Sequence, residues 1–142
     1  MKKNTLCQLV TAVGVACSLV SCSTMTAKKY EESQFVGSWN YEQPGFHIIP
    51  PISARVENRS DGTSKTVITK VGQAPAKSSS SKMKKLKAGT VLMENEWSIS
   101  GSTFVEKSES GKTFRYQILS VSPDQYVLRN GMGDKKVYDR IK

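Results

Sequence analysis

Residues with chemically reactive side chains are few in this chain, and their spacing matches no familiar catalytic or metal-binding pattern. His47 is the only histidine, so a metal site built from several histidine ligands cannot form. No nucleophile-elbow sequence places a serine to work with it. Glu94 and Glu96 face the same side of one predicted strand, whereas paired glycosidase acids normally come from different elements. The sequence therefore predicts a protein that is not an enzyme and that carries no metal or cofactor.

The first 21 residues have the layout of a secretory signal. A pair of lysines gives a positive start, residues 5–20 carry no charge and are mostly apolar, and small residues follow. The apolar run is too short for a comfortable membrane span. The small residues permit cleavage either just before Cys22 or a few residues later, near Thr24 or Ala27.

The run Leu19-Val20-Ser21-Cys22 resembles the lipobox of bacterial lipoproteins. The resemblance implies that the Cys22 sulfur receives a diacylglycerol, that the signal is cut just before it, and that a fatty acyl chain such as palmitate modifies the new N-terminus. We therefore expect residues 1–21 to be a signal peptide and Cys22 to attach the mature protein to a membrane of the cell envelope. In this family Ser23 after the cysteine is compatible with delivery to the outer membrane.

The mature chain is expected to be a small, basic, disulfide-free domain. Removing the signal from 142 residues leaves 121, enough for one domain of ordinary size. Cys7 and Cys17 leave with the signal and Cys22 carries lipid, so thiol chemistry is excluded. Two of the 21 basic residues are also lost, and the remaining 19 exceed the 12 acidic residues. This balance favours anionic partners such as phospholipid head groups or acidic glycans, and the expected location argues against nucleic acid.

Eight short segments have the features of β-strands. Alternation is clearest in Lys112–Val121, where Phe114, Tyr116 and Ile118 share one face. Asp61-Gly62, between two of the segments, is a hairpin signal. The predicted strands are Phe35–Glu42, Ile52–Asn58, Ser64–Gly72, Met93–Ser100, Ser102–Ser108, Lys112–Val121, Gln125–Asn130 and Lys135–Lys142.

The strand pattern predicts an all-β domain over residues 35–142. Residues 22–34 are polar and without periodicity, and are expected to be a flexible tether. Antiparallel strands with one apolar face, joined by tight turns, close most simply into an up-and-down barrel. Eight strands leave an interior just wide enough for packed side chains or one small ligand. A sandwich of two sheets is the alternative architecture.

The segment Gly37-Ser38-Trp39 resembles the Gly-x-Trp motif in the first strand of the lipocalin superfamily of ligand-binding barrels. In that family an arginine at the end of the last strand packs on the tryptophan ring, and Arg140 in Tyr138-Asp139-Arg140 holds the matching place. The resemblance implies a lipocalin-like barrel closed by Gly37, Trp39 and Arg140. The family's middle motif, Thr-Asp-Tyr, has only a loose counterpart in Pro123-Asp124-Gln125-Tyr126.

Two groups of residues are candidates for binding. Aromatic residues on neighbouring strands either line a pocket for a small hydrophobe or fill the core; they are Trp97, Phe104, Phe114, Tyr116 and Tyr126. The segment Ala74–Ala88 contains four consecutive serines and no acid, and is either a contact for anionic lipid or glycan or a solvated loop. Its lysines proposed for polyanion contact are Lys77, Lys82, Lys84, Lys85 and Lys87.

The sequence as a whole predicts a membrane-anchored envelope lipoprotein with a non-catalytic role, which binds a small hydrophobic or anionic envelope ligand. The alternative is a protein–protein interaction module, such as an envelope assembly factor or an enzyme inhibitor. That module would use loops such as Gly45–Pro51 and would have a solid barrel interior.

Overall fold

A computed structural model describes residues 29–45, 49–73 and 86–142 of the chain. In this part a short 3-10 helix, η1 (Glu32–Gln34), precedes eight strands. Cys22, His47 and four of the candidate lysines, Lys77, Lys82, Lys84 and Lys85, lie outside the described residues. The strands are β1 (Gly37–Gln43), β2 (Ile52–Asn58), β3 (Thr63–Val71), β4 (Val91–Ser100), β5 (Thr103–Ser108), β6 (Thr113–Val121), β7 (Gln125–Arg129) and β8 (Lys135–Arg140).

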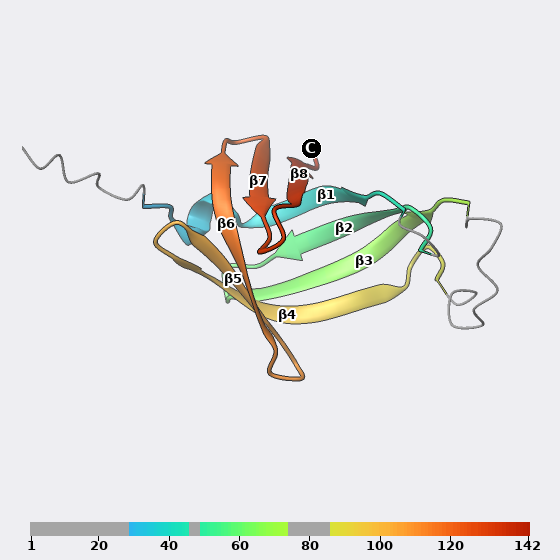
Figure 1. The fold of residues 1–142 in the computed structure, drawn as a ribbon, viewed down its shortest axis with the longest axis horizontal. Helices are drawn as coiled ribbons and strands as arrows, with labels where there is room; N and C mark the ends of the chain where they lie inside the picture. The colour runs from blue at the N-terminus through green and yellow to red at the C-terminus, as the bar shows by residue number, and fades with distance from the viewer. Residues whose placement is uncertain (1–28, 46–48, 74–85) are drawn as a thin grey trace, which may run out of the picture.

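The eight strands form one closed antiparallel barrel in which each strand pairs with the next along the chain (Figure 1). β1 and β8 close it through three residue pairs, from Trp39 opposite Arg140 to Tyr41 opposite Tyr138. The predicted up-and-down barrel is therefore confirmed, and the sandwich alternative is wrong. Closure pairs the first strand with the last, so each of the eight described strands has a paired neighbour on both sides.

The observed strand limits differ from the predicted ones by at most two residues, as they do where β1 begins. β1 starts at Gly37 rather than at Phe35, because Phe35 closes the turn of η1. Gly37 has a φ of +134°, which residues with side chains rarely adopt. A Cβ at this position would lie 2.6 Å from Nη1 of Arg140. Glycine is therefore required here both by the backbone and by the close approach of Arg140.

The β2–β3 connection is a tight hairpin, as the Asp-Gly signal predicts. The Asp61 carboxylate accepts hydrogen bonds from the backbone N–H of Thr63 at 2.9 Å and from its hydroxyl at 2.6 Å. Gly62 supplies the positive φ, +82°, that this turn needs. These local bonds fix the register of β2 on β3, in which Asn58 is opposite Ser64.

Packing begins before residue 35, inside the range expected to be a tether. Tyr30 is 7% exposed, and its ring meets that of Phe35 edge-on with centroids 6.4 Å apart. Its backbone N–H donates to the carbonyl of Gly101 at 3.4 Å. The aromatic ring of Tyr30 covers apolar surface at this end of the barrel, and a lack of periodicity in a short segment gives no signal of such a contact.

Candidate functional site

Aromatic side chains fill the end of the barrel next to η1. Trp39 and Phe35 are fully buried, Tyr126 is 1% exposed, and Phe104 and Trp97 are hardly more accessible. The Trp39 and Tyr126 rings meet edge-on with centroids 4.6 Å apart, and Trp97 stacks on Phe104 at 5.5 Å. We call Phe35, Trp39, Trp97, Phe104 and Tyr126 the aromatic floor. Its close packing leaves this end of the interior solid.

Arg140 covers one side of the floor. Its guanidinium carbon lies 4.1 Å from the centroid of the Trp39 ring, within the range of a cation–π contact. Nη1 of Arg140 donates to the carbonyl of Val36 at 3.3 Å, and Nε donates to the carbonyl of Pro123. These contacts place Gly37, Trp39 and Arg140 together where the ends of β1 and β8 meet, which is the arrangement that the Gly-x-Trp resemblance implies.

The polar atoms of the floor meet at the carbonyl of Phe35. It accepts hydrogen bonds from Nε1 of Trp39 at 2.8 Å and from Nδ2 of Asn58 at 3.2 Å. Asn58 also donates to the hydroxyl of Tyr126 at 3.3 Å. Burial raises the pKa of Tyr126 well above its usual range, so its hydroxyl stays protonated. This network ties the segment before β1 to β2 and β7.

Polar and ionisable side chains form the next layer of the interior. Side chains two residues apart on a strand share a face, so Tyr41, Asn95 and Glu106 each lie on the inner face next to a floor residue. Tyr116 is the cross-strand partner of Phe104, and Lys136 is two residues from the inward Tyr138. We call these five residues the inner polar layer: Tyr41, Asn95, Glu106, Tyr116 and Lys136.

Lys136 is the cation of this layer and lies among tyrosines. Its Nζ donates to the hydroxyl of Tyr116 at 3.4 Å and is 4.7 Å from the centroid of that ring. It lies 5.6 Å from the ring of Tyr41. Burial lowers the pKa of Lys136, and the nearby Glu106 carboxylate acts in the opposite direction. Lys136 is therefore a partly buried cation on the inner face of the barrel.

Glu106 is the acid of the layer. Burial raises its pKa above the usual value, while Lys136 and the Tyr116 hydroxyl act to lower it. Two tyrosines are shifted in the same direction. Burial and the Glu106 carboxylate both raise the pKa of Tyr41 and of Tyr116. The side chains therefore form one electrostatically coupled group.

Asn95 adds an unsatisfied acceptor. The side chain is 7% exposed, its Nδ2 contacts the Met93 sulfur at 3.2 Å, and its Oδ1 has no hydrogen-bond partner in the described part of the chain. A buried amide oxygen without a partner is uncommon and is satisfied at modest cost by a ligand or a water molecule.

Beyond the polar layer the inner face of β4 and of β6 becomes apolar and exposed, whereas on β2 and β3 Ala54 and Ile68 are each 1% exposed. Met93, two residues from Asn95 on β4, is 47% exposed. Phe114, the cross-strand partner of Glu106, is 45% exposed. Both belong to the inward series of their strands but lie past the packed part of the interior. We call Met93 and Phe114 the apolar rim.

Four of the five aromatic residues proposed from the sequence as pocket-lining residues pack in one buried cluster, and only Phe114 is exposed. Trp97, Phe104 and Tyr126 belong to the packed floor, Tyr116 to the polar layer and Phe114 to the rim. The sequence reasoning missed Tyr41, Asn95, Glu106 and Lys136. Every second residue of a strand faces the same side, so counting from the inward aromatic residue of each strand would have placed these four side chains inside. Only apolar residues were considered for the interior.

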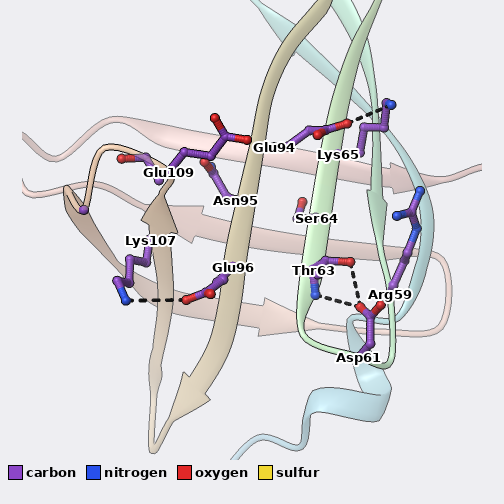
Figure 2. A pocket seen from close by; sticks show the side chains of 12 residues that line it. Arg59, Asp61, Thr63, Ser64, Lys65, Glu94, Asn95, Glu96, Lys107 and Glu109 are labelled. Carbon is purple, nitrogen blue, oxygen red and sulfur yellow. Dashed lines mark hydrogen bonds and ion pairs between the residues drawn. The ribbon is translucent and has the colours of Figure 1, made fainter.

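A hollow of about 600 Å³ lies elsewhere, over β3, β4 and β5 (Figure 2). Its charged side chains come from the outer series of these strands and from the turns beside them, and four of them form two ion pairs. Nζ of Lys65 is 2.8 Å from the Glu94 carboxylate, and Nζ of Lys107 is 3.6 Å from that of Glu96. Exposed pairs of this kind contribute little to stability. Since these two pairs neutralise four of the charges and the hollow lies on the outer surface, it is a weaker candidate than the barrel interior.

Lys87 is the one candidate polyanion contact within the described residues, and it is exposed. Within those residues no three His, Cys, Asp or Glu side chains are gathered so that they could hold a metal ion. No helix in the described ranges is long and apolar enough to cross a bilayer. Comparisons with protein-family models, with curated proteins and with solved structures find no match to this chain.

Proposed function

We propose that this protein is a lipid-anchored component of the cell envelope whose lipocalin-like barrel binds a small amphiphilic ligand without catalysis. The observation that carries the proposal is the inner polar layer between a solid floor and an exposed apolar rim. A barrel needing only stability would continue its apolar packing, because buried ionisable groups are expensive. Groups whose pKa values are displaced by burial cluster at functional sites more often than elsewhere.

In this proposal, lipid attachment at Cys22 holds the barrel at the membrane. We expect the wild-type protein to fractionate with membranes and to gain the mass of its acyl chains. The Cys22→Ser variant should lose that mass, because it offers no sulfur to receive the lipid, and once its signal is removed it should leave the membrane fraction. Intact-mass measurement and ultracentrifugation read both effects. A wild-type chain that carries no lipid would contradict this part of the proposal.

Binding in the barrel is tested by filling the polar layer. The chain from residue 22 onward, carrying Cys22→Ser, lacks both the predicted signal and the lipid and keeps every described residue. We expect it to bind the anionic fluorophore anilinonaphthalene sulfonate saturably, at one molecule per chain. Asn95→Phe places a ring among the inner side chains and should abolish the binding. Glu96→Phe is the matched control, since Glu96 is the outward neighbour of Asn95.

The two outcomes separate a binding barrel from a solid one. Circular dichroism checks that both variants stay folded, and mass spectrometry of an organic extract of the wild-type protein gives a second measurement that needs no variant. Equal fluorophore binding by both variants, together with an extract free of hydrophobic molecules, would reject the proposed interior site. It would favour an interaction module with a solid barrel.

A further inference from the structure

The start of β4 has a described neighbour on one side only. The pairing of β4 with β5 begins at Asn95 opposite Ser108, so no described strand pairs with Val91–Glu94 on the side away from β3. We call Val91–Glu94 the free edge. Between it and the β5–β6 turn lies an open hollow of about 610 Å³, lined from the turn by Ser108, Glu109 and Ser110. In Figure 1, β5 turns away from β4 here, and β4 borders the sheet formed by β1 to β4.

Two residues of the free edge direct their backbone groups away from β3. Successive residues of a strand direct their N–H and C=O groups to opposite sides. The N–H of Trp97 donates to the β2–β3 turn at 2.7 Å, so Glu94, three residues earlier, points to the other side. The carbonyl of Thr90 accepts a hydrogen bond from β3 at 2.9 Å, so Val91 also points to the other side. Among the described residues no backbone group pairs with them there.

The side chains of the free edge favour pairing with another strand. Val91 is 46% exposed and Met93 is 47% exposed, and the edge holds neither a lysine nor a proline, the residues with which natural proteins block such edges. Its single charge, on Glu94, is neutralised by Nζ of Lys65 at 2.8 Å. An extended polypeptide satisfies unpaired strand groups, and the same edge of a second copy offers both those groups and a matching apolar surface.

We infer that two copies of this chain associate through antiparallel pairing of their free edges about a twofold axis. Val91 of each copy then lies opposite Glu94 of the other, and Leu92 lies opposite Met93. Each pair of Val91 with Glu94 exchanges two backbone hydrogen bonds, because both residues direct their groups to the free side. Leu92 and Met93 cover apolar surface between these pairs. The inference does not depend on the ligand proposed for the barrel interior.

The faces of β4 support this register. Val91 is the cross-strand partner of Val67, and Glu94 is the partner of Lys65. Cross-strand partners share a face, and Lys65 and Val67 are two residues apart on β3, so Val91 and Glu94 both lie on the outer face. The bulge at Leu92 accounts for this, because it adds one residue to β4. Pairing Val91 with Glu94 therefore matches outer face to outer face.

Charges beside the free edge are complementary in the pair of copies. Glu109 reaches from the β5–β6 turn toward β4 (Figure 2) and forms no ion pair with another described residue. Lys87 is exposed and lies four residues before Val91. The turn continues the line of the β4–β5 pairing, so the chain entering β4 of one copy passes the turn of the other. Lys87 of each copy thereby approaches Glu109 of the other, twice by symmetry. Such exposed pairs add little affinity but favour this register.

Sedimentation equilibrium measures the association. For the chain from residue 22 onward, carrying Cys22→Ser, we expect a reversible equilibrium between monomer and dimer. Met93→Lys places an ammonium group between the two edges without a partner and should weaken the dimer roughly tenfold or more. Met132→Lys is the matched control, because it makes the same change of charge in the β7–β8 turn, where Met132 is 86% exposed. Circular dichroism checks that both variants stay folded.

Disulfide trapping tests the register without a disruptive variant. The chain with Cys22→Ser has no other cysteine after residue 21. A mixture of Val91→Cys and Glu94→Cys chains should form a linked dimer on mild oxidation, because directly opposite Cα atoms are about 5.5 Å apart. Val91→Cys alone should not link, because its two copies are offset by three residues, about 10 Å. Val91→Cys mixed with Met132→Cys measures the rate of chance collisions.

The outcomes separate this inference from the proposed function. A chain that stays monomeric up to millimolar concentration, with the Val91→Cys and Glu94→Cys mixture linking no faster than the collision control, would overturn the inference. A dimer that Met93→Lys leaves unchanged would place the interface elsewhere and overturn it as well. Fluorophore binding is measured on the same samples. A monomer that binds the fluorophore leaves the proposed function standing, whereas a dimer that binds none counts against the interior site alone.

Discussion

Replacing Trp39 with alanine is expected to remove most of the stability of the barrel. Trp39 is fully buried, contacts Tyr126 and stacks under Arg140, so its removal leaves a cavity in the floor and exposes the guanidinium contact. Truncation of a buried tryptophan to alanine typically destabilises a protein by about 3–5 kcal/mol. The carbonyl of Phe35 also loses the indole N–H that donates to it at 2.8 Å. For a domain of this size such a loss is a large part of the total stability.

Urea unfolding followed by circular dichroism measures this effect. Phe114→Ala is the control, because Phe114 is also an inward-series aromatic residue but is 45% exposed. Its replacement should change the free energy of unfolding by less than about 1 kcal/mol. If the two variants were destabilised equally, the distinction between the packed floor and the open rim would not hold.

The strand order and the closure of this barrel could be predicted from the sequence. Alternating apolar residues in segments such as Thr113–Val121 define strands, and tight turns such as the one at Asp61 make neighbours antiparallel. Gly37-Ser38-Trp39 and Arg140 then indicated which ends meet. The signals for strand order are local, and those for which ends meet lie in two short motifs. Closure was expected because a sheet with many strands must protect its edges.

The polar content of the interior could not be read in the same way. Glu106 and Lys136 look like ordinary solvent-facing charges, because charged residues in a strand usually mark its outer face. Their inward direction depends on register relative to Phe104 and Tyr138, and their contact depends on bringing β5, β6 and β8 around one axis. Exposed Phe114 is the converse case, since a strand that outruns the packed interior carries its apolar residue into solvent.

The floor and the polar layer therefore divide the work of the interior. The floor supplies the packing that holds eight short strands closed, and it does so with aromatic rings that leave no room for a ligand. The polar layer contributes less to stability, because each ionisable group in it loses hydration that its partners restore only in part. The same desolvation strengthens any charged contact that a ligand makes there. Under the proposed function, stability and binding thus depend on successive inward residues of the same strands.

The pH dependence of the free energy of unfolding is expected to reflect the titration of Glu106. Burial raises its pKa in the folded protein above the ordinary value of 4.5, so the folded state favours the protonated acid. The stabilising effect of the proton is fully present below about pH 4.5 and is lost as the pH rises through the folded-state pKa. Each unit of difference between the two pKa values corresponds to about 1.4 kcal/mol. The surrounding tyrosines, Tyr41, Tyr116, Tyr126 and Tyr138, have pKa values raised by burial above 10, so they keep their protons in this range. Burial lowers the pKa of the neighbouring Lys136.

Glu106→Gln removes this titration while keeping the shape and a hydrogen-bond donor. Between pH 4 and 8 the wild-type protein should lose more stability than the variant does, measured as the free energy of unfolding in urea at each pH. Glu94→Gln is the control. Hydrogen bonding and attraction to Lys65 lower the pKa of Glu94, so its contribution to the free energy of unfolding changes with pH in the opposite direction. Glu94 is fully exposed, so its slope should be small. Parallel pH profiles for the wild type and Glu106→Gln would mean that Glu106 is as well solvated in the folded barrel as in the unfolded chain, and the inner polar layer would then be no desolvated site.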